Sequence, residues 1–138
     1  MNREELIERI EKDDYAVANN FKVHSYNGDN LVIEMTPAAQ HINAIGVVHG
    51  GALYSLMDSA SGFLLVLKDK ISVTLDSSIN FISASKEGEK LYTKTEILHS
   101  GRTTNIIDVK VYNEDEKFIA HGTFTMFNKG DKLRKLKD

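Results

Sequence analysis

A single long stretch of helical periodicity, residues 50–68, constrains this chain more than any other feature. Apolar residues recur there at helical spacing and form one stripe: Leu53, Leu56, Met57, Ala60, Leu64 and Leu67. Few polar residues interrupt the other sides, and a helix that is apolar on most sides is usually buried on more than one face. We therefore expect this helix at the centre of the fold, with its remaining face against a second copy of the chain.

The rest of the chain is predicted to be mainly strands. A short helix is expected at residues 3–13 and a hairpin at 21–26 and 31–35, around the turn Asn27-Gly28-Asp29. Further strands are expected at 71–81, 91–98, 104–112 and 118–127. In the first of these the alternation predicts one apolar face, made of Ile71, Val73, Leu75, Ile79 and Phe81. One long helix followed by antiparallel strands indicates an α+β fold, with a curved sheet wrapped around the helix.

Composition limits the domain organisation and the function class. The 138 residues fit one domain, 1–138, with residues 1–20 as an N-terminal helix and lead-in and 129–138 as a charged tail. A formal charge of −3 does not indicate a basic surface that would bind nucleic acid, and the absence of cysteine excludes thiolate chemistry. The longest apolar run, residues 63–67, is far too short to span a membrane, and the charged start is unlike a secretory signal. We expect a cytoplasmic protein without nucleic-acid or membrane partners.

A polar loop with adjacent glycines, residues 41–51, leads directly into the predicted helix. A helix N-terminus offers unpaired backbone N–H groups, which suit a developing oxyanion. Asp58 follows two turns later, and the positions three and four residues away hold no lysine or arginine. An acid in an apolar helix without a local partner needs a reason, because burying an unpaired charge is costly. Together these features suggest acyl chemistry.

The same residues allow simpler interpretations. The glycine pair could form only a tight turn, Asp58 could pair with a distant cation, and His49 could be a hydrogen bonder that fixes the loop. A metal site built from His41, His49 and Asp58 lacks a recognised ligand spacing, so no metal is expected. The helix serines lie outside any G-x-S-x-G elbow, which argues against a serine triad.

The pattern Asn43-x-x-Gly46-x-x-His49-Gly50-Gly51, followed by Asp58, resembles the signature of hotdog-fold thioesterases of the PaaI-like (phenylacetic acid degradation) type. The similarity continues through Thr74 and Asp76, the turn at 100–102 and the segment 120–123. It therefore extends over nearly the whole domain.

This resemblance implies hydrolysis of an acyl- or aryl-CoA thioester in a cleft shared by two subunits, without a cofactor. It implies that the Gly50 amide donates to the thioester carbonyl and that Asp58 of the neighbouring subunit is the general base or nucleophile. Asn43 would place the water or the carbonyl, and Thr74 would orient the water. His49 would hold the loop and, as a further catalytic residue, would hydrogen-bond near the thioester sulfur or carbonyl. The substrate-binding residues implied are Gly51, Phe81, His99, Ser100, Gly101, Arg102, Thr103 and Thr104, with Arg102 as the candidate for a phosphate contact.

Three alternatives stay open. The chain could bind acyl-CoA without catalysis, it could be a purely structural homo-oligomer, or it could be a hotdog dehydratase, although the Asp-x-Asn-Pro-x-His pattern of that class is absent. In the leading hypothesis the protein is a dimer or tetramer. The pattern does not identify the acyl group.

Overall fold

A computed structural model describes residues 2–130 and shows one sheet wrapped around one long helix. Two short helices, α1 (Arg3–Glu11) and α2 (Asp14–Ala18), precede the hairpin β1 (Phe21–Asn27) and β2 (Asn30–Met35). The 3-10 turn η1 (Ala39–His41) and the long helix α3 (Gly50–Leu67) follow. The second half holds β3 (Ser72–Phe81), β4 (Leu91–Ser100), β5 (Thr104–Asn113) and β6 (Phe118–Asn128).

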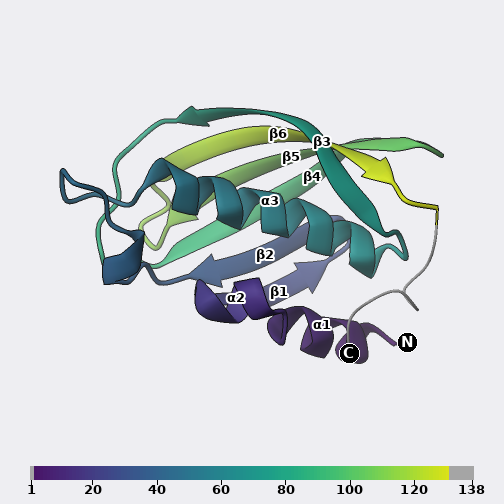
Figure 1. The fold of residues 1–138 in the computed structure, drawn as a ribbon, viewed down its shortest axis with the longest axis horizontal. Coiled ribbons are helices and arrows are strands. Elements are labelled where there is room, and N and C mark those ends of the chain that lie inside the picture. Colours follow the sequence, from purple (N-terminus) through teal and green to yellow (C-terminus); the bar gives the residue numbers. More distant parts are fainter. Residues whose placement is uncertain (1, 131–138) are drawn as a thin grey trace.

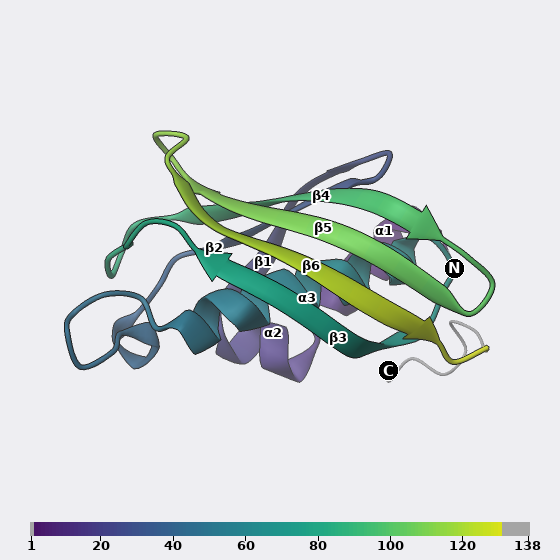
Figure 2. The ribbon, with the colours of Figure 1, turned by 90° about the horizontal axis from the view of Figure 1, so that it is seen from above.

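The six strands form one antiparallel sheet in the order β1-β2-β4-β5-β6-β3. Figure 1 shows α3 crossing the sheet, and Figure 2 shows the sheet curving over α3 from above. The expected α+β architecture, a curved antiparallel sheet around one central helix, is confirmed. Strands β1 and β3 lie at the two edges of this sheet.

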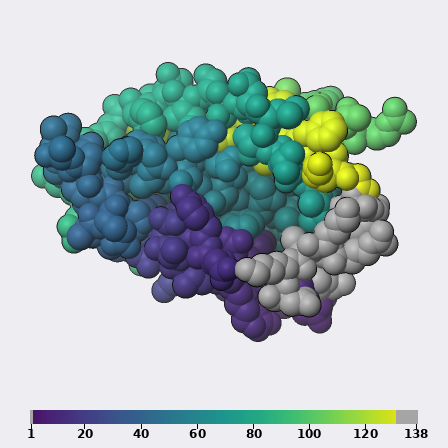
Figure 3. All heavy atoms as spheres, in the orientation of Figure 1, coloured from purple at the N-terminus to yellow at the C-terminus, as the bar shows by residue number. Residues whose placement is uncertain are grey.

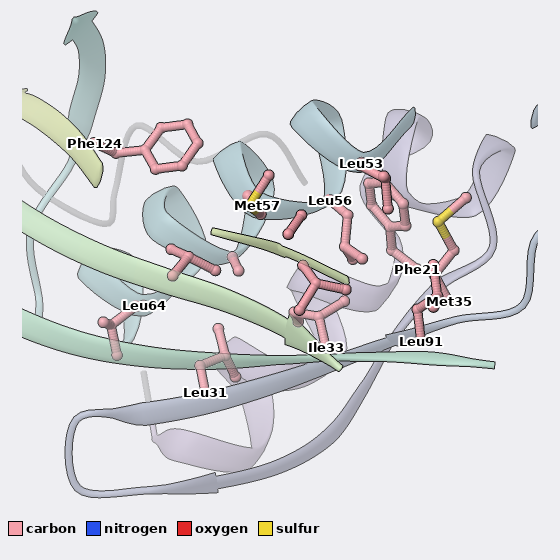
Figure 4. Close-up of a cluster of buried hydrophobic side chains, with 14 of the residues drawn as sticks. Phe21, Leu31, Ile33, Met35, Leu53, Leu56, Met57, Leu64, Leu91 and Phe124 are labelled. Carbon is pink, nitrogen blue, oxygen red and sulfur yellow. The ribbon is translucent and has the colours of Figure 1, made fainter. Parts of the chain in front are cut away.

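The core lies between α3 and the concave face of the sheet (Figure 4). Strict alternation on β2 sends Leu31, Ile33 and Met35 inward, all at most 1% exposed. On α3, Leu56, Met57 and Leu64 are fully buried against them. Each such side chain contributes roughly 1.5–3 kcal/mol relative to an exposed position. The burial of these side chains therefore fixes the position of α3 against the sheet.

By length and composition alone, helix α3 is long and apolar enough to cross a membrane. The core helix of a globular fold has the same length and composition, and α3 packs along its length against the sheet. Its hydrophobicity is therefore explained by the core, as the periodicity indicated.

The alternation predicted for β3 holds at Ile79, which packs against the core, but it is wrong in the first part of the strand, where Val73 is 47% exposed. A register shift between Thr74 and Asp76 in the pairing with β6 places a bulge in the strand. Thr74 before the bulge and Ser77 after it both bond to side chains of α3, whereas Leu75 is 58% exposed. An extra residue inverts the alternation. The bulge therefore turns a hydroxyl, instead of an apolar side chain, towards the helix.

The N-terminal segment also differs from the single helix expected at residues 3–13. Helix α1 ends at Glu11, and Asp13 caps a second helix by accepting from the Ala16 N–H. Most of the predicted charged tail, 131–138, lies outside the described residues. The single-domain boundaries stay a prediction.

Candidate active site

The loop before α3 is closed on itself by Asn43. Its Oδ1 atom accepts from the backbone N–H groups of Ile45 and Val47, at 3.1 and 3.2 Å. The backbone N–H of Asn43 donates to the Val47 carbonyl. Asn43 therefore shapes the loop. Its side-chain NH₂ group has no partner in residues 2–130 and is available to a ligand.

His41 anchors the base of this loop. Its Nδ1 accepts from the Ala38 N–H at 3.0 Å, so the neutral ring carries its proton on Nε2 and donates to Asn19 Oδ1 at 3.1 Å. Burial lowers the pKa of His41 below its ordinary value of 6.5. The His41 carbonyl also accepts from the His49 N–H, which connects the anchor to the start of α3.

His49 is the N-cap of α3. Its Nδ1 accepts from the Gly51 N–H at 2.7 Å, so this side chain holds the loop, as one interpretation of the sequence predicted. The Gly50 N–H has no acceptor in the described part of the chain. A free N–H at the positive end of an 18-residue helix is a preorganised donor for an anion.

Gly50 lines a hollow of about 320 Å³, together with Asn43, Val47 and Phe81. The Phe81 ring covers Gly50 so closely that a Cβ there would lie 3.0 Å from its Cζ. A side chain at position 50 would therefore push on this ring, which is 56% exposed and has room to shift.

Asp58 lies on the partly exposed side of α3, at the wall of a second hollow of about 440 Å³. The Thr74 hydroxyl donates to Asp58 Oδ1 at 2.6 Å. No lysine or arginine of residues 2–130 forms a salt bridge with this carboxylate. The interpretation of Asp58 as a paired surface acid therefore finds no partner in the described residues.

The surroundings of Asp58 differ from the expectation in one respect. At about 100° per residue, the sequence places Asp58 away from the apolar stripe together with Tyr54, Ser61 and Leu65. Tyr54 is exposed, but Ser61 and Leu65 are buried, at 0% and 1% exposure. The sheet wraps further around α3 than one apolar stripe requires. The exposed strip is narrower, and it continues from Asp58 through Gly62 to Val66. Figure 3 shows atoms of α3 at the surface between the N-terminal helices and β3.

Gly50 and Asp58 belong to two different hollows of one chain. They are eight residues apart on α3, which at 1.5 Å per residue corresponds to about 12 Å along the axis. Groups that act on one carbonyl must each lie about 3 Å from the reacting atoms. Within one chain the two residues therefore line separate hollows.

The turn 99–104 joins β4 to β5 near the C-terminal end of α3, away from Gly50. Lys70, two residues before β3, bonds to Ser100 Oγ at 2.8 Å, and Asn128 donates to the carbonyls of Gly101 and Arg102. This leaves the Arg102 side chain exposed, with no partner in the described residues. The structure therefore separates this turn from Gly51 and Phe81 within one chain, and the shared substrate groove stays a prediction.

The Tyr54 hydroxyl lies 2.7 Å from Ser77 Oγ and fastens α3 to β3. Three residues that line the two hollows were missed by sequence reasoning. Ser85 lines the Gly50 hollow with a buried hydroxyl that has no partner in residues 2–130. Tyr15 and Met126 line the Asp58 hollow. Nothing in the local pattern distinguishes these side chains from ordinary surface or strand positions.

The described residues contain no group of three or more His, Asp or Glu side chains that could hold a metal ion. His41, His49 and Asp58 in particular have separate roles: the ring of His41 is buried in the loop anchor, and that of His49 caps the helix.

The chain matches the model of the thioesterase superfamily over residues 45–120, which include α3 and the strands up to the first part of β6. Acyl-coenzyme A thioesterase 13 of Mus musculus is 33% identical over 100 residues, which are 70% of this chain and 71% of that protein. Acyl-coenzyme A thioesterase PaaI of Escherichia coli is 28% identical over 110 residues, 80% of this chain and 79% of the relative. A putative esterase of Archaeoglobus fulgidus is 32% identical over 69% of this chain, and the chain spans 62% of its length.

A solved structure adds a comparison in three dimensions. The structure of a hypothetical thioesterase protein from Streptococcus pneumoniae with coenzyme A has a TM-score of 0.78 and 34% identity, over 82% of this chain and 91% of that chain. Two variants of the same protein, one with alanine for an aspartate and one with alanine for a threonine sixteen positions further on, have a TM-score of 0.77 and 33% identity, over 81% of this chain. Asp58 and Thr74 are separated by the same 16 positions.

These matches agree with the motif around His49 and with the fold, and the enzyme class that the motif indicated, a thioesterase, is that of the matching family. By its family model and its relatives, the chain belongs to the thioesterase superfamily of hotdog proteins.

Proposed function

We propose that this protein hydrolyses an acyl- or aryl-CoA thioester to the free acid and CoA, in two equivalent sites that each need residues from two subunits. In each site the Gly50 amide of one subunit binds the thioester oxygen and Asp58 of the other serves as general base or nucleophile. The observation that carries this proposal is that Gly50 and Asp58 line different hollows, eight residues apart on α3, or about 12 Å of ideal helix axis.

A second copy has a surface on which to dock. Strand β3 is a sheet edge, and edge strands present unpaired N–H and C=O groups that invite another strand. Val73 and Leu75 on this edge strand are 47% and 58% exposed. Both hollows adjoin β3, through Phe81 at one end and Thr74 at the other. A two-fold axis perpendicular to this edge, which sets the two copies of β3 antiparallel, would bring the Gly50 hollow of each subunit to the Asp58 hollow of its partner.

The chemistry suits these groups. When Asp58 acts as the base, it accepts a proton from water, whose oxygen attacks the thioester carbonyl carbon. The negative charge that develops on the carbonyl oxygen meets the free Gly50 N–H. The carbon–sulfur bond then breaks, and the CoA sulfur leaves as a thiol after it takes up the proton. When Asp58 attacks directly, water cleaves the resulting anhydride in a second step.

Other features support recognition of CoA. The Streptococcus pneumoniae relative was solved with coenzyme A, and its aspartate and threonine variants match the spacing of Asp58 and Thr74. Arg102 is an exposed cation on a turn that Lys70 and Asn128 hold rigid. We assign it to the CoA phosphates. The assembly is a dimer, or a tetramer of two such dimers, and its location is cytoplasmic.

The first test is release of free thiol from a panel of acyl- and aryl-CoA thioesters. The wild-type protein is expected to release thiol from at least one of them. The variant Asp58→Asn is expected to lose more than about a hundredfold in kcat while it sediments as the wild-type oligomer. If the wild-type protein binds these thioesters without turnover, it is a non-catalytic acyl-CoA binder.

The second test addresses the sharing of sites. Asp58→Asn and Gly50→Pro each damage every site of their own homodimer. After unfolding and refolding as a mixture, half of the dimers combine the two chains, and each of these has one intact site. About a quarter of wild-type activity should then return. Activity that stays at the level of the separate variants would contradict a shared site.

A further inference from the structure

The hollow beside Asp58 continues well beyond the carboxylate. It follows α3 from Asp58 through Gly62 to Val66 and ends near Ile71 and Ser72, at the start of β3. Eight residues of helix correspond to about 12 Å. The carboxylate is therefore at one end of an elongated space, and the turn between α3 and β3 is at the other end.

The lining beyond Asp58 is mostly apolar. Six residues from α3, β3, β6 and the segment between α3 and β3 make up its apolar part: Gly62, Phe63, Val66, Ile71, Val73 and Met126. The polar part consists of Ser59, Ser72, Thr74 and Asp13, whose carboxylate accepts from the Ala16 N–H. Hydrocarbon that is buried against a surface of this kind lowers the free energy of the complex. A charged group would lose its hydration there. Its chemistry fits an apolar acyl chain.

Gly62 determines how much of this space is open. A Cβ at this position would meet only the Met126 methyl group, at 4.0 Å, which is ordinary contact. The backbone would therefore accept a side chain, and glycine costs a helix interior stability relative to alanine. The absence of a side chain there leaves room in the hollow one turn beyond Asp58.

Tyr15 bounds the hollow on the side of the N-terminal helices. Its hydroxyl lies 2.6 Å from Ser55 Oγ, and Ser55 donates its own proton to the Gly51 carbonyl. Tyr15 is therefore the donor of this pair, and the bond fixes its ring beside α3, one turn before Asp58. Helix α2, which carries Tyr15, lies outside the segment 45–120 that the family model matches.

We propose that this hollow takes the acyl group of the thioester, and that Gly62 sets its cross-section so that the protein selects straight apolar acyl chains of medium length over acetyl. This rests on the proposed function, since the reacting carbonyl must lie at Asp58. Val66 and Ile71 limit the length, and Tyr15 closes the side towards α2. The kcat/KM relative to that of acetyl-CoA should increase roughly fourfold for each methylene group that enters the hollow, the equivalent of about 0.8 kcal/mol.

The test compares acetyl-, butyryl-, hexanoyl- and octanoyl-CoA with three variants. Gly62→Leu fills the hollow and should lower the ratio of hexanoyl- to acetyl-CoA kcat/KM at least about tenfold, because a misplaced methylene is worth 10- to 200-fold. Val66→Ala lengthens the hollow and should shift the preference towards octanoyl-CoA. Val17→Leu adds bulk on α2 outside the hollow and should keep the wild-type ratios.

Calorimetry measures the dissociation constants of the same thioesters, so that binding is tested separately from turnover. If no thioester is hydrolysed but Gly62→Leu still weakens hexanoyl-CoA selectively, the proposed catalysis fails and the acyl site stands. If the wild-type protein hydrolyses the panel and neither Gly62→Leu nor Val66→Ala changes the ratios, the acyl site is wrong. Sedimentation of each variant shows whether the oligomer is intact. If the oligomer of the Gly62→Leu variant dissociates, Gly62→Ala and Val66→Ala must still change the ratios of kcat/KM in opposite directions.

Discussion

The Thr74 hydroxyl donates to Asp58 Oδ1 at 2.6 Å, across the junction between β3 and α3. Thr74 reaches this position because the bulge that follows it lets the strand turn a hydroxyl towards the helix. The bond fixes the orientation of the carboxylate and leaves its other oxygen free for water or substrate.

Replacing Thr74 by valine should therefore lower kcat about ten- to a hundredfold, because a hydrogen bond to a charged group contributes about 1.5–3 kcal/mol. Thr74→Ser keeps the hydroxyl and should recover most of the activity. Steady-state kinetics on one thioester measure both variants. Equal losses in the valine and serine variants would mean that the methyl group, instead of the hydroxyl, matters.

The Gly50 amide can be removed without disturbing the helix. Proline lacks the N–H and is well tolerated at the first position of a helix, so Gly50→Pro removes the proposed oxyanion donor. We expect kcat to fall about 10²- to 10³-fold, as for other donors of this kind.

Gly50→Ala is the matched control for this substitution. It keeps the N–H and adds a Cβ that pushes on the exposed Phe81 ring. Circular dichroism should show the same fold in both variants. Activity of Gly50→Pro equal to that of Gly50→Ala would exclude the amide as an oxyanion donor.

Arg102 should affect binding of CoA and leave the chemical step unchanged. Arg102→Ala is expected to raise KM for a CoA thioester up to about fivefold, the range of an exposed ion pair, and the difference should shrink at high salt. A thioester of N-acetylcysteamine lacks the phosphates, so its KM should not change. A similar increase for both thioesters would place Arg102 in a structural role.

Stability should fall in mild acid because of His41. Burial lowers the pKa of this side chain, so below about pH 6.5 the unfolded chain takes up a proton that the folded chain resists. The contribution of His41 to the free energy of unfolding should therefore be constant above that pH, decrease as the pH falls from there towards the lowered pKa, and level off below it.

His41→Asn is the comparison for this effect, since Asn Oδ1 can accept from the Ala38 N–H in place of Nδ1. Urea unfolding at several pH values should give a smaller decrease in this variant than in the wild-type protein. Identical pH profiles for the two proteins would show that His41 does not contribute to the acid sensitivity.

The elements that could be predicted from sequence are those with one strong periodicity. The pattern for α3 agreed with its bounds within one residue, and Gly28 marked the β1–β2 hairpin correctly. The pairing of Thr74 with Asp58 as members of one site followed from the family resemblance, and the structure places the two in contact.

What failed depends on contacts between distant parts of the chain. The bulge after Thr74 inverts the alternation of β3, and no residue type at Leu75 marks it. Leu65 is buried because the sheet wraps around two sides of α3, which a helical wheel cannot indicate.

The bulge in β3 divides one strand into two sections whose side chains are out of phase. Before it, Thr74 faces the carboxylate, and beyond it, Ser77 and Ile79 serve attachment to α3 and the core. Removing Leu75 would restore regular pairing and rotate one section relative to the other, so either the reactive hydroxyl or the packing would be lost. The strand therefore tolerates substitution far better than a change in its length, and homologues that keep the chemistry should preserve the number of residues between Asp58 and Phe81.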